Sequence, residues 1–285
     1  SYILIIPAFG IISEIVSKMS GRGIFGRKGM IMAIISIAVL GLIVFAHHEF
    51  TEGMDLRTKL YFSSATMIIA LPTGIKIFSW LMTLYEGNLN RTIPLNYAIA
   101  FIFLFTLGGL SGIALSSSIL DISYHDSYFV IAHFHIVLSL GAIYGILGGY
   151  YYWSPKILGI MYDNTLSYIG FWLLTIGALT TFMPMHNLGL DGMPRRYKDY
   201  AGFDIYETWH FIASYGSIIN IIALIIIMKT IIDQISSGST IGDDMWHREK
   251  FFNIHGIKSI YSLEFIISSP PKYHSFDEIP VIIEE

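Results

Sequence analysis

The chain has no cysteine and very little charge, and each absence narrows what it can be. Without cysteine among its 285 residues it forms no disulfide, iron–sulfur cluster or thiolate ligand, so a bound metal must rely on histidine and carboxylate. Charged residues make up only 13% of the chain, about half the share usual in soluble domains. A net charge of -4 offers no basic surface for nucleic acid. A membrane protein with histidine ligands fits these limits.

Long apolar runs account for the 54% of residues that are hydrophobic. About twenty apolar residues cross a bilayer, and only helices satisfy their own backbone in such uniform runs. A shorter run, Tyr2–Ile12, is interpreted as a transmembrane helix cut in the middle; a re-entrant or interfacial stretch is the alternative. We predict an all-α polytopic bundle of this truncated helix and six full transmembrane helices, at Gly29–Ala46, Leu60–Leu84, Leu95–Leu115, Tyr128–Trp153, Leu166–Met185 and Phe211–Met228.

Two regions follow from composition. Residues 1–235 form the predicted transmembrane core, and the charged stretch 236–285 forms a tail on the inner membrane surface. The positive-inside rule gives the orientation, because basic residues gather in loops on one side of the membrane and acidic residues on the other. The basic, inner side carries Lys18, Arg22, Arg27, Lys28, Arg91 and Lys156, and the outer side carries Glu49, Glu52, Asp55, Asp121 and Asp126.

Two histidines interrupt the apolar run FVIAHFHIVLSLG. A two-residue step turns His133 and His135 about 200° apart on a helix, so their side chains point to opposite sides. Such spacing suits a helix that stands between two cofactors and gives an imidazole to each. The alternative is a pair of neutral core histidines bonded to nearby carbonyls.

Further histidines lie at the predicted outer side. His47 and His48 close the second span and can converge on one metal ion if the backbone turns there, or else reach the headgroup region. His125 and Asp126 can bind a hard cation such as magnesium, or form a solvated pair in a loop. Asp121 nearby is an acceptor of the same ambiguous kind.

A lysine inside a membrane span is costly and is a functional hypothesis by default. Lys76, Thr73 and Thr66 lie roughly on one face, a stripe that can relay protons from the inner side unless Lys76 reaches the inner surface instead. Ser13 lies nearly three helical turns beyond Tyr2 and shares its face.

Two arginines in GMPRRY break the positive-inside pattern. Arg195 and Arg196 can meet lipid phosphates or grip the carboxylates of a porphyrin bidentately. The second interpretation is favoured because the helix of His133 and His135 begins on the same outer side.

Four motifs, AHH, SATMIIALPTGIKIFSW, LDISYHDSYFVIAHFH and GMPRRY, occur in the order and spacing of one family. With the closing SPPKYHSFDEIP they cover nearly the whole chain, which resembles cytochrome c oxidase subunit I of the haem–copper oxygen reductases. The resemblance implies a terminal respiratory oxidase that reduces dioxygen to water with electrons from cytochrome c, coupled to proton uptake and pumping.

The resemblance also implies roles for the residues. It makes His47 and His48 ligands of copper B, His133 the axial ligand of the high-spin haem a3, and His135 an axial ligand of the low-spin haem a. His125 and Asp126 would form a magnesium site shared with subunit II. Arg195, Arg196 and Asp121 would lie at the haem propionates. A lysine-lined proton path of Lys76, Thr73 and Ser13 would lead to a catalytic tyrosine, Tyr2.

The family's HPE motif, which immediately precedes the tyrosine, is not in this chain. The third copper ligand, the second low-spin haem ligand and the acidic residues of another proton path are therefore expected from an amino-terminal part of subunit I, either a separate polypeptide or the rest of a longer one. Expected partners are that part, subunits II and III, membrane lipids, and cytochrome c through subunit II. The expected location is the mitochondrial inner membrane, or a bacterial plasma membrane.

Several rival functions remain at this point. A quinol-oxidising relative would look similar in this subunit. A metal-free ion transporter would use Lys76 and the histidines as a proton relay. A nitric-oxide-reducing relative would not be expected to have both the tyrosine and the lysine path, and intact ligands argue against a metal-free assembly remnant.

Overall fold

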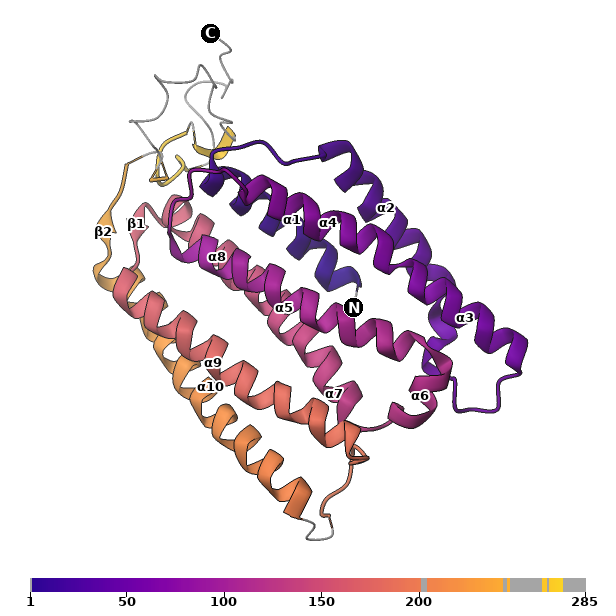
Figure 1. The fold of residues 1–285 in the computed structure, drawn as a ribbon. Helices are drawn as coiled ribbons and strands as arrows, with labels where there is room; N and C mark the ends of the chain where they lie inside the picture. Colours follow the sequence, from indigo (N-terminus) through magenta and orange to yellow (C-terminus); the bar gives the residue numbers. More distant parts are fainter. Residues whose placement is uncertain (1, 201–203, 243–244, 247–262, 266, 274–285) are drawn as a thin grey trace.

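The chain folds into a bundle of long helices that cross between two ends (Figure 1). The computed structural model describes residues 2–200, 204–242, 245–246, 263–265 and 267–273. The helices in this part are α1 Tyr2–Ser20, α2 Arg27–Ile43, α3 Leu56–Ile68, α4 Ala70–Leu84, α5 Ile93–Ser116, α6 Ser118–Tyr124, α7 Tyr128–Phe134, α8 Ile143–Leu158, α9 Asn164–Leu190 and α10 Asp204–Ser237.

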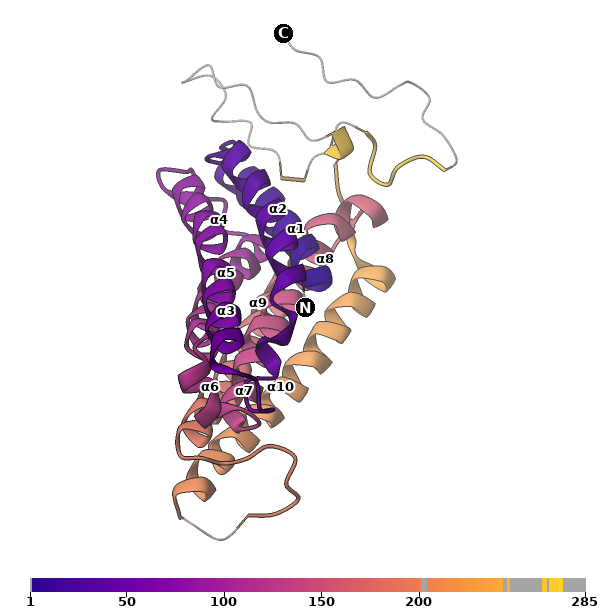
Figure 2. The same ribbon diagram turned by 90° about the vertical axis from the view of Figure 1, so that its right-hand side faces the viewer.

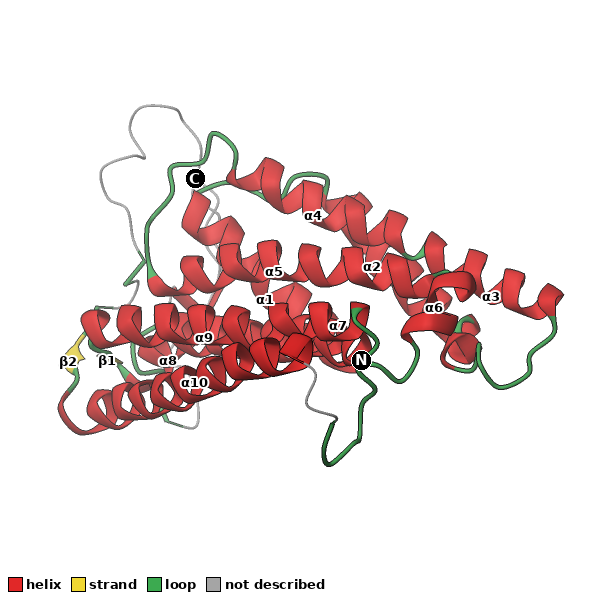
Figure 3. Cartoon of the chain, turned by 60° about the horizontal axis from the view of Figure 1, so that its bottom comes forward, coloured by secondary structure: helices red, strands yellow, loops and turns green. Residues whose placement is uncertain are grey.

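Shorter elements join these helices. A 3₁₀ turn, η1 Phe45–His48, follows α2; a π-helical segment, η2 His135–Ala142, connects α7 to α8; and a 3₁₀ turn, η3 Leu263–Phe265, lies in the tail. The strands β1 Ile160–Met161 and β2 Ser239–Thr240 pair antiparallel. We call the end of the bundle with β1 and β2 the inner face and the end with α6 the outer face (Figure 3).

The predicted fold class is confirmed. Among the described residues six helices are long and apolar enough to cross a membrane: Tyr2–Ser20, Leu56–Leu84, Ile93–Ser116, Tyr128–Leu158, Asn164–Leu190 and Ile205–Ser237. Many large apolar side chains point outward, such as Leu42 at 78% and Phe78 at 69% exposure. Such exposure is expected where lipid covers the surface, because apolar faces this extensive are not stable in water.

Two crossings differ from the prediction. The apolar run ends at Ile12, but α1 continues to Ser20 and, at 19 residues, is long enough to cross. Its second half is buried against other helices rather than lipid, and Ile15 and Val16 are fully buried. The predicted span Gly29–Ala46 is an α-helix of only 17 residues, α2, which gives way to η1 at the outer face.

A proline breaks the predicted span Leu60–Leu84 into α3 and α4. Pro72 has no N–H to donate to the carbonyl four residues earlier, and the helix is interrupted at Ile69. The two halves still form one continuous crossing, Leu56–Leu84.

The core lies where α1 packs against α4, α5 and α8. Phe9 of α1 contacts the rings of Trp80, Phe101 and Phe105 at centroid distances of 5.6, 6.2 and 5.3 Å. In contrast, α9 and α10 pair closely along one flank of the bundle (Figures 1 and 2). Helix α1 is therefore held by protein on several sides, which fixes the polar residues that it carries.

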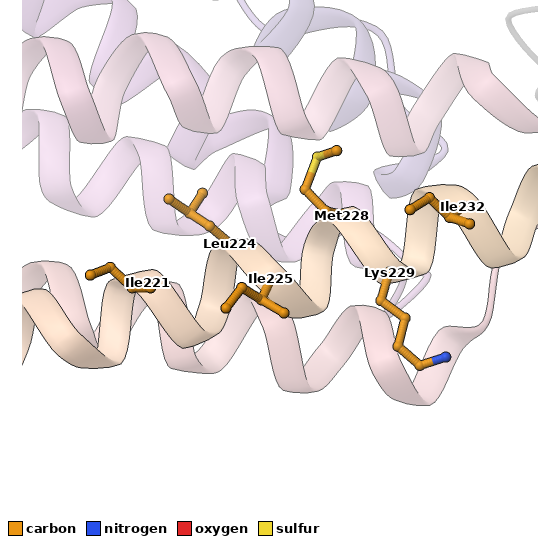
Figure 4. A pocket seen from close by; sticks show the side chains of 6 residues that line it. All are labelled: Ile221, Leu224, Ile225, Met228, Lys229 and Ile232. Carbon is orange, nitrogen blue, oxygen red and sulfur yellow. The ribbon is translucent and has the colours of Figure 1, made fainter.

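A shallow apolar groove of about 480 Å³ follows the surface of α10 (Figure 4). All its lining residues belong to this one helix: Ile221, Leu224, Ile225, Met228, Lys229 and Ile232. No predicted site residue lines the groove, so the candidate chemistry must be sought elsewhere in the bundle.

Candidate functional site

His133 lies at the end of α7 and faces α5. Its Nδ1 is 3.0 Å from the carbonyl oxygen of Gly108 and 2.9 Å from the hydroxyl of Ser111. That hydroxyl also bonds the Gly108 carbonyl. We assign the Nδ1 proton to this carbonyl, which leaves the lone pair of Nε2 available, as in histidines that bind metals. The ring also lies close to Gly112, where an added Cβ would come within 2.9 Å of its Cε1.

His135 faces a different helix. Its Nδ1 lies 2.8 Å from the carbonyl oxygen of Ile131, and its ring stacks on Phe182 of α9 at a centroid distance of 4.7 Å. The π-helical segment begins at this residue, and such segments are frequent at functional sites. The two histidines of α7 and η2 thus face different helices, α5 and α9.

His47 and His48 meet because η1 turns tightly at the end of α2. Their Nε2 atoms lie 3.0 Å apart. The hydroxyl of Thr66 donates to the carbonyl of Phe62 and so accepts from the Nδ1 of His47 at 3.1 Å. Two imidazoles bound to one ion at about 2.0–2.1 Å would place these nitrogens roughly 3 Å apart at an angle near 90°. The distance between these nitrogens therefore matches that of two ligands to one metal ion.

The pair has no third ligand in the described part of the chain. Across residues 2–200 and the other described ranges, no group of three or more histidine, aspartate or glutamate side chains is placed to hold a metal ion. A site at His47 and His48 would therefore need at least one donor from outside these residues.

A cluster of ionisable side chains lies at the outer face, around the end of α6 and the loop after α9. The ring of His125 lies between two carboxylates, with its Nδ1 3.7 Å from Asp121 and its Nε2 3.5 Å from Asp126. Arg195 donates from its Nε to the Asp126 carboxylate at 2.6 Å, and its backbone N–H donates to the Asp126 carbonyl at 2.8 Å. The predicted cation pair and one predicted arginine thus belong to one cluster.

Backbone contacts hold this cluster together. The N–H of Tyr128 donates to the carbonyl of Met193 at 3.0 Å, and Ser127 forms an isolated β-bridge with Pro194. The loop after α9 is thereby fastened to the start of α7. Arg196 next to it is exposed and bonds none of the described residues, so its guanidinium remains available to an anion.

Burial sets the charge behaviour of Asp121. Its side chain is largely enclosed at the end of α6, and this burial raises the pKa of its carboxyl group. His125 opposes the shift, whereas the negative charge of Asp126 adds to it.

Lys76 lies in the interior of the bundle and does not reach the inner surface. Only 1% of the residue is exposed, and its Nζ has no hydrogen-bond partner among the described residues. The ammonium lies 4.9 Å from the ring centroid of Phe9 and 5.0 Å from that of Trp80. These cation–π contacts stabilise the charge only in part, because burying an unpaired ammonium costs several kcal/mol.

Ser13 shares the neighbourhood of Lys76. Its hydroxyl accepts a hydrogen bond from the Nε1 of Trp80 at 3.0 Å and donates to the carbonyl of Phe9 at 2.8 Å. The structure thus brings Ser13 of α1 and Lys76 of α4 to the same side chain, that of Trp80. Thr73, one turn from Lys76, donates to its own helix at the carbonyl of Ile69.

Tyr2 packs against the helix that leads to the histidine pair. A Cβ added at Gly41 of α2 would come within 2.7 Å of the Tyr2 ring, so the ring rests directly on this glycine. None of the hydrogen bonds among the described residues joins Tyr2 to Ser13, Lys76 or Thr73. The four predicted proton-path residues therefore lie on α1 and α4 without forming a continuous chain.

Two further histidines were missed by the sequence analysis. The Nδ1 of His186 in α9 and the Nε2 of His210 in α10 are buried without partners among the described residues. His186 contacts the ring of Phe129, and His210 stacks on Tyr200. The predicted spans ended at the residue before His186 and began at the residue after His210, so neither counted as a membrane histidine.

Comparison with known proteins agrees with this arrangement. The family model described as Cytochrome C and Quinol oxidase polypeptide I matches residues 1–219. The cytochrome c oxidase subunit 1 of Candida albicans is 43% identical, over 100% of this chain and 54% of that protein. The subunit of Yarrowia lipolytica is 49% identical over 99% and 53%, and that of Cereibacter sphaeroides is 40% identical over 98% and 47%. The chain spans about half the length of the curated relatives it matches.

A solved structure is similar in fold. The cryo-EM structure of a heme-copper terminal oxidase dimer matches with a TM-score of 0.67 over 76% of this chain and 44% of that one. At 18% sequence identity this likeness shows a shared fold alone. The family model, in contrast, covers more than half of the chain, and relatives align along its length. The chain belongs to the Cytochrome C and Quinol oxidase polypeptide I family.

Proposed function

We propose that the chain forms the carboxyl-terminal part of the catalytic subunit of a cytochrome c oxidase. This terminal respiratory enzyme reduces dioxygen to water with electrons from cytochrome c and couples the reaction to proton uptake and pumping. The observation that carries the proposal is the placement of His133 and His135, which face different helices while each ring uses its Nδ1 for a carbonyl of the bundle.

The donor set fits haem and copper. No described residue hydrogen-bonds the Nε2 of His133 or of His135, which would serve as axial ligands of the high-spin haem a3 and the low-spin haem a. His47 and His48 would hold copper B with a third ligand from the amino-terminal part of the subunit. When bound, these groups supply electron transfer and the binding of oxygen.

The protein's own contribution at this site is orientation. The carbonyl of Gly108 fixes the ring and the tautomer of His133, and the hydroxyl of Thr66 does the same for His47. Hydrogen bonds made by a protein group to a metal-binding histidine typically change the metal affinity 10–100-fold, because they orient the ligand and raise its basicity. We infer that Gly108 and Thr66 position the two ligand groups of the active site.

The outer cluster suits the edge of a haem. Arg196, exposed and unpaired among the described residues, would bind a haem propionate, with Arg195 and Asp121 at the same rim. His125 and Asp126 would hold magnesium together with subunit II. Arg195 already neutralises Asp126, so magnesium binding requires this carboxylate to share its oxygens with the arginine.

Protons would reach the site from the inner side through α1 and α4. Lys76 is buried against Trp80, which Ser13 also contacts, and there its side chain can release a proton as the ammonium and take one up as the amine without meeting bulk water. Thr73 and Tyr2 would complete the route toward the histidine pair. Water molecules must bridge these residues, because their side chains do not bond one another directly.

The partners and location follow from the same proposal. The chain would join the amino-terminal part of subunit I, subunits II and III and membrane lipids, with cytochrome c docking on subunit II. Its membrane would be the mitochondrial inner membrane. Residues 1–235 would form the catalytic core and residues 236–285 a tail on the matrix side; much of this tail lies outside the described residues.

An optical spectrum of the purified complex tests the proposal, together with mass spectrometry to identify the remaining half of the subunit. We expect His133→Ala to abolish the high-spin haem signal and oxygen consumption while the complex still inserts. His210→Ala is the control, because this histidine lies on α10 and packs against Tyr200 and Tyr128. Full oxygen consumption by the His133→Ala complex would disprove the axial assignment.

Two related functions give different results in the same experiment. A quinol-oxidising relative would show the same haems but a subunit II without its additional copper site. A metal-free proton transporter would show no visible chromophore at all.

A further inference from the structure

Three buried tyrosines in the inner half of the bundle have hydroxyl groups without partners. Tyr97 of α5 and Tyr151 of α8 are 0% exposed, and Tyr162, just before α9, is 3% exposed. No described residue hydrogen-bonds any of the three phenol oxygens. A buried hydroxyl without a partner is disfavoured by about as much as a hydrogen bond contributes, and native proteins rarely leave one so.

The three rings form one cluster. The centroids of Tyr97 and Tyr151 are 5.6 Å apart, and those of Tyr151 and Tyr162 are 4.8 Å apart. Tyr144 joins the cluster at 5.4 Å from Tyr97, but its hydroxyl is satisfied by Thr175 at 2.9 Å. The same environment therefore contains one phenol with a protein partner and three without.

Nearby hydroxyls do not satisfy the cluster. Ser167 of α9 and Thr230 of α10 are fully buried and approach the oxygen of Tyr151 without reaching hydrogen-bond geometry. Each donates its proton to a backbone carbonyl instead, of Asp163 at 2.6 Å and of Ile226 at 2.9 Å. Their oxygens still have lone pairs to offer, so the space beside Tyr151 has both donors and acceptors.

A polar route leads from this space to the inner face. Gln234 lies one turn beyond Thr230 on α10, and Ser154 lies one turn beyond Tyr151 on α8, so both are displaced toward the same end. The side chain of Gln234 bonds Ser154 at 3.3 Å and donates to the carbonyl of Ile160 in β1 at 2.9 Å. It also accepts from the hydroxyl of Tyr150 at 2.6 Å.

The geometry points to a buried water site enclosed by the hydroxyls of Tyr97, Tyr151 and Tyr162 and supplied from the inner face past Ser154 and Gln234. A buried water usually makes about three hydrogen bonds to groups that otherwise lack partners, which is what this cluster offers. The site places a group of exchangeable protons between α5, α8, α9 and α10. In contrast, Lys76 and the residues around it lie on α1 and α4.

X-ray hydroxyl-radical footprinting of the assembled complex tests the site, because bound water is activated in place and labels the side chains that touch it. We expect Tyr97 and Tyr151 to be labelled although they are fully buried. The internal control is Phe50, which is equally buried in a separate apolar cluster with Ala46 and Phe62 and should not be labelled. Labelling of Tyr97, Tyr151 and Tyr162 no faster than that of Phe50 would overturn the inference.

Thermal unfolding of phenylalanine variants gives an independent test, because the presence and the absence of water predict opposite shifts of the unfolding midpoint. If water bridges the phenols, Tyr151→Phe breaks hydrogen bonds and lowers the midpoint. If the hydroxyls are bare, the same change removes a buried polar group and raises the midpoint, which would also refute the site. Tyr144→Phe is the matched control, because it loses a direct bond to Thr175 in either case and calibrates a lowered midpoint.

Discussion

The close approach of Gly112 to His133 gives a sharp prediction. A methyl group added at Gly112 would lie 2.9 Å from the Cε1 and 3.6 Å from the Nε2 of the ring. Ordinary contact between such atoms begins near 3.4 Å, so the ring must move by roughly 0.5 Å, which is the tolerance within which a functional site holds its ligands. We therefore expect Gly112→Ala to misplace the ligand without unfolding the helix.

The magnitude follows from two opposing terms. Alanine is favoured over glycine inside a helix by about 0.5–1 kcal/mol, whereas overpacking of a core costs typically about 1–3 kcal/mol. The net loss of stability is therefore at most about 2.5 kcal/mol, and the main effect falls on the haem. Disturbing the bond between His133 and the Gly108 carbonyl should weaken high-spin haem binding roughly 10–100-fold.

The assay is the haem content and carbon monoxide difference spectrum per complex. Gly109→Ala is the matched control, because it is on the same helix and an added Cβ there meets nothing within 4 Å. The control should keep the spectrum and gain slightly in stability. Wild-type haem content and spectrum in Gly112→Ala would show that His133 does not hold the haem in this geometry.

Three further predictions follow from the same contacts. Lys76→Met should slow reduction of the active-site haem in stopped-flow measurements, and unchanged kinetics would place Lys76 outside the proton route. The same change should raise the thermal midpoint, because it removes a buried ammonium that no described residue hydrogen-bonds. Thr66→Val should reduce the copper content measured by elemental analysis about 10-fold or more, since His47 loses its acceptor, while wild-type copper would refute this support. Hydrogen bonds from the hydroxyl and N–H of Thr58 lower the pKa of Asp55. The ionised Asp55 therefore stabilises the start of α3 at a pH above its ordinary pKa of 3.8, and this stabilisation is lost as the pH falls through the lowered pKa. The stability advantage of the wild type over Asp55→Ala should therefore shrink as the pH falls from about 5 toward 3, and an advantage independent of pH would contradict it.

The buried lysine shows where sequence reasoning left two outcomes open. From the sequence, Lys76 could extend to the inner surface or remain inside the bundle. The choice depended on whether α1 covers this face of α4, and Phe9 and Trp80 do enclose the ammonium. Composition cannot supply this information, because it depends on which helices become neighbours.

The histidine pair of η1 shows a similar limit. Adjacent residues on a regular helix diverge, so the convergence of His47 and His48 required a turn that the motif alone does not specify. The missed His186 and His210 have a simpler cause. They flank the apolar runs, and a window that measures only hydropathy excludes the residues just beyond its ends.

The sequence by itself determined the membrane class, the approximate position of most crossings and that His133 and His135 would face different neighbours. These features depend on hydropathy and on the rotation per residue of a helix, both of which act over a few turns of chain. Only the tertiary structure decided that Arg195 would neutralise Asp126, that Ser13 and Lys76 would both contact Trp80, and that the rings of Tyr97, Tyr151 and Tyr162 would form one cluster. Each of these joins residues distant in the chain, and their contact depends on how whole helices pack rather than on any local pattern.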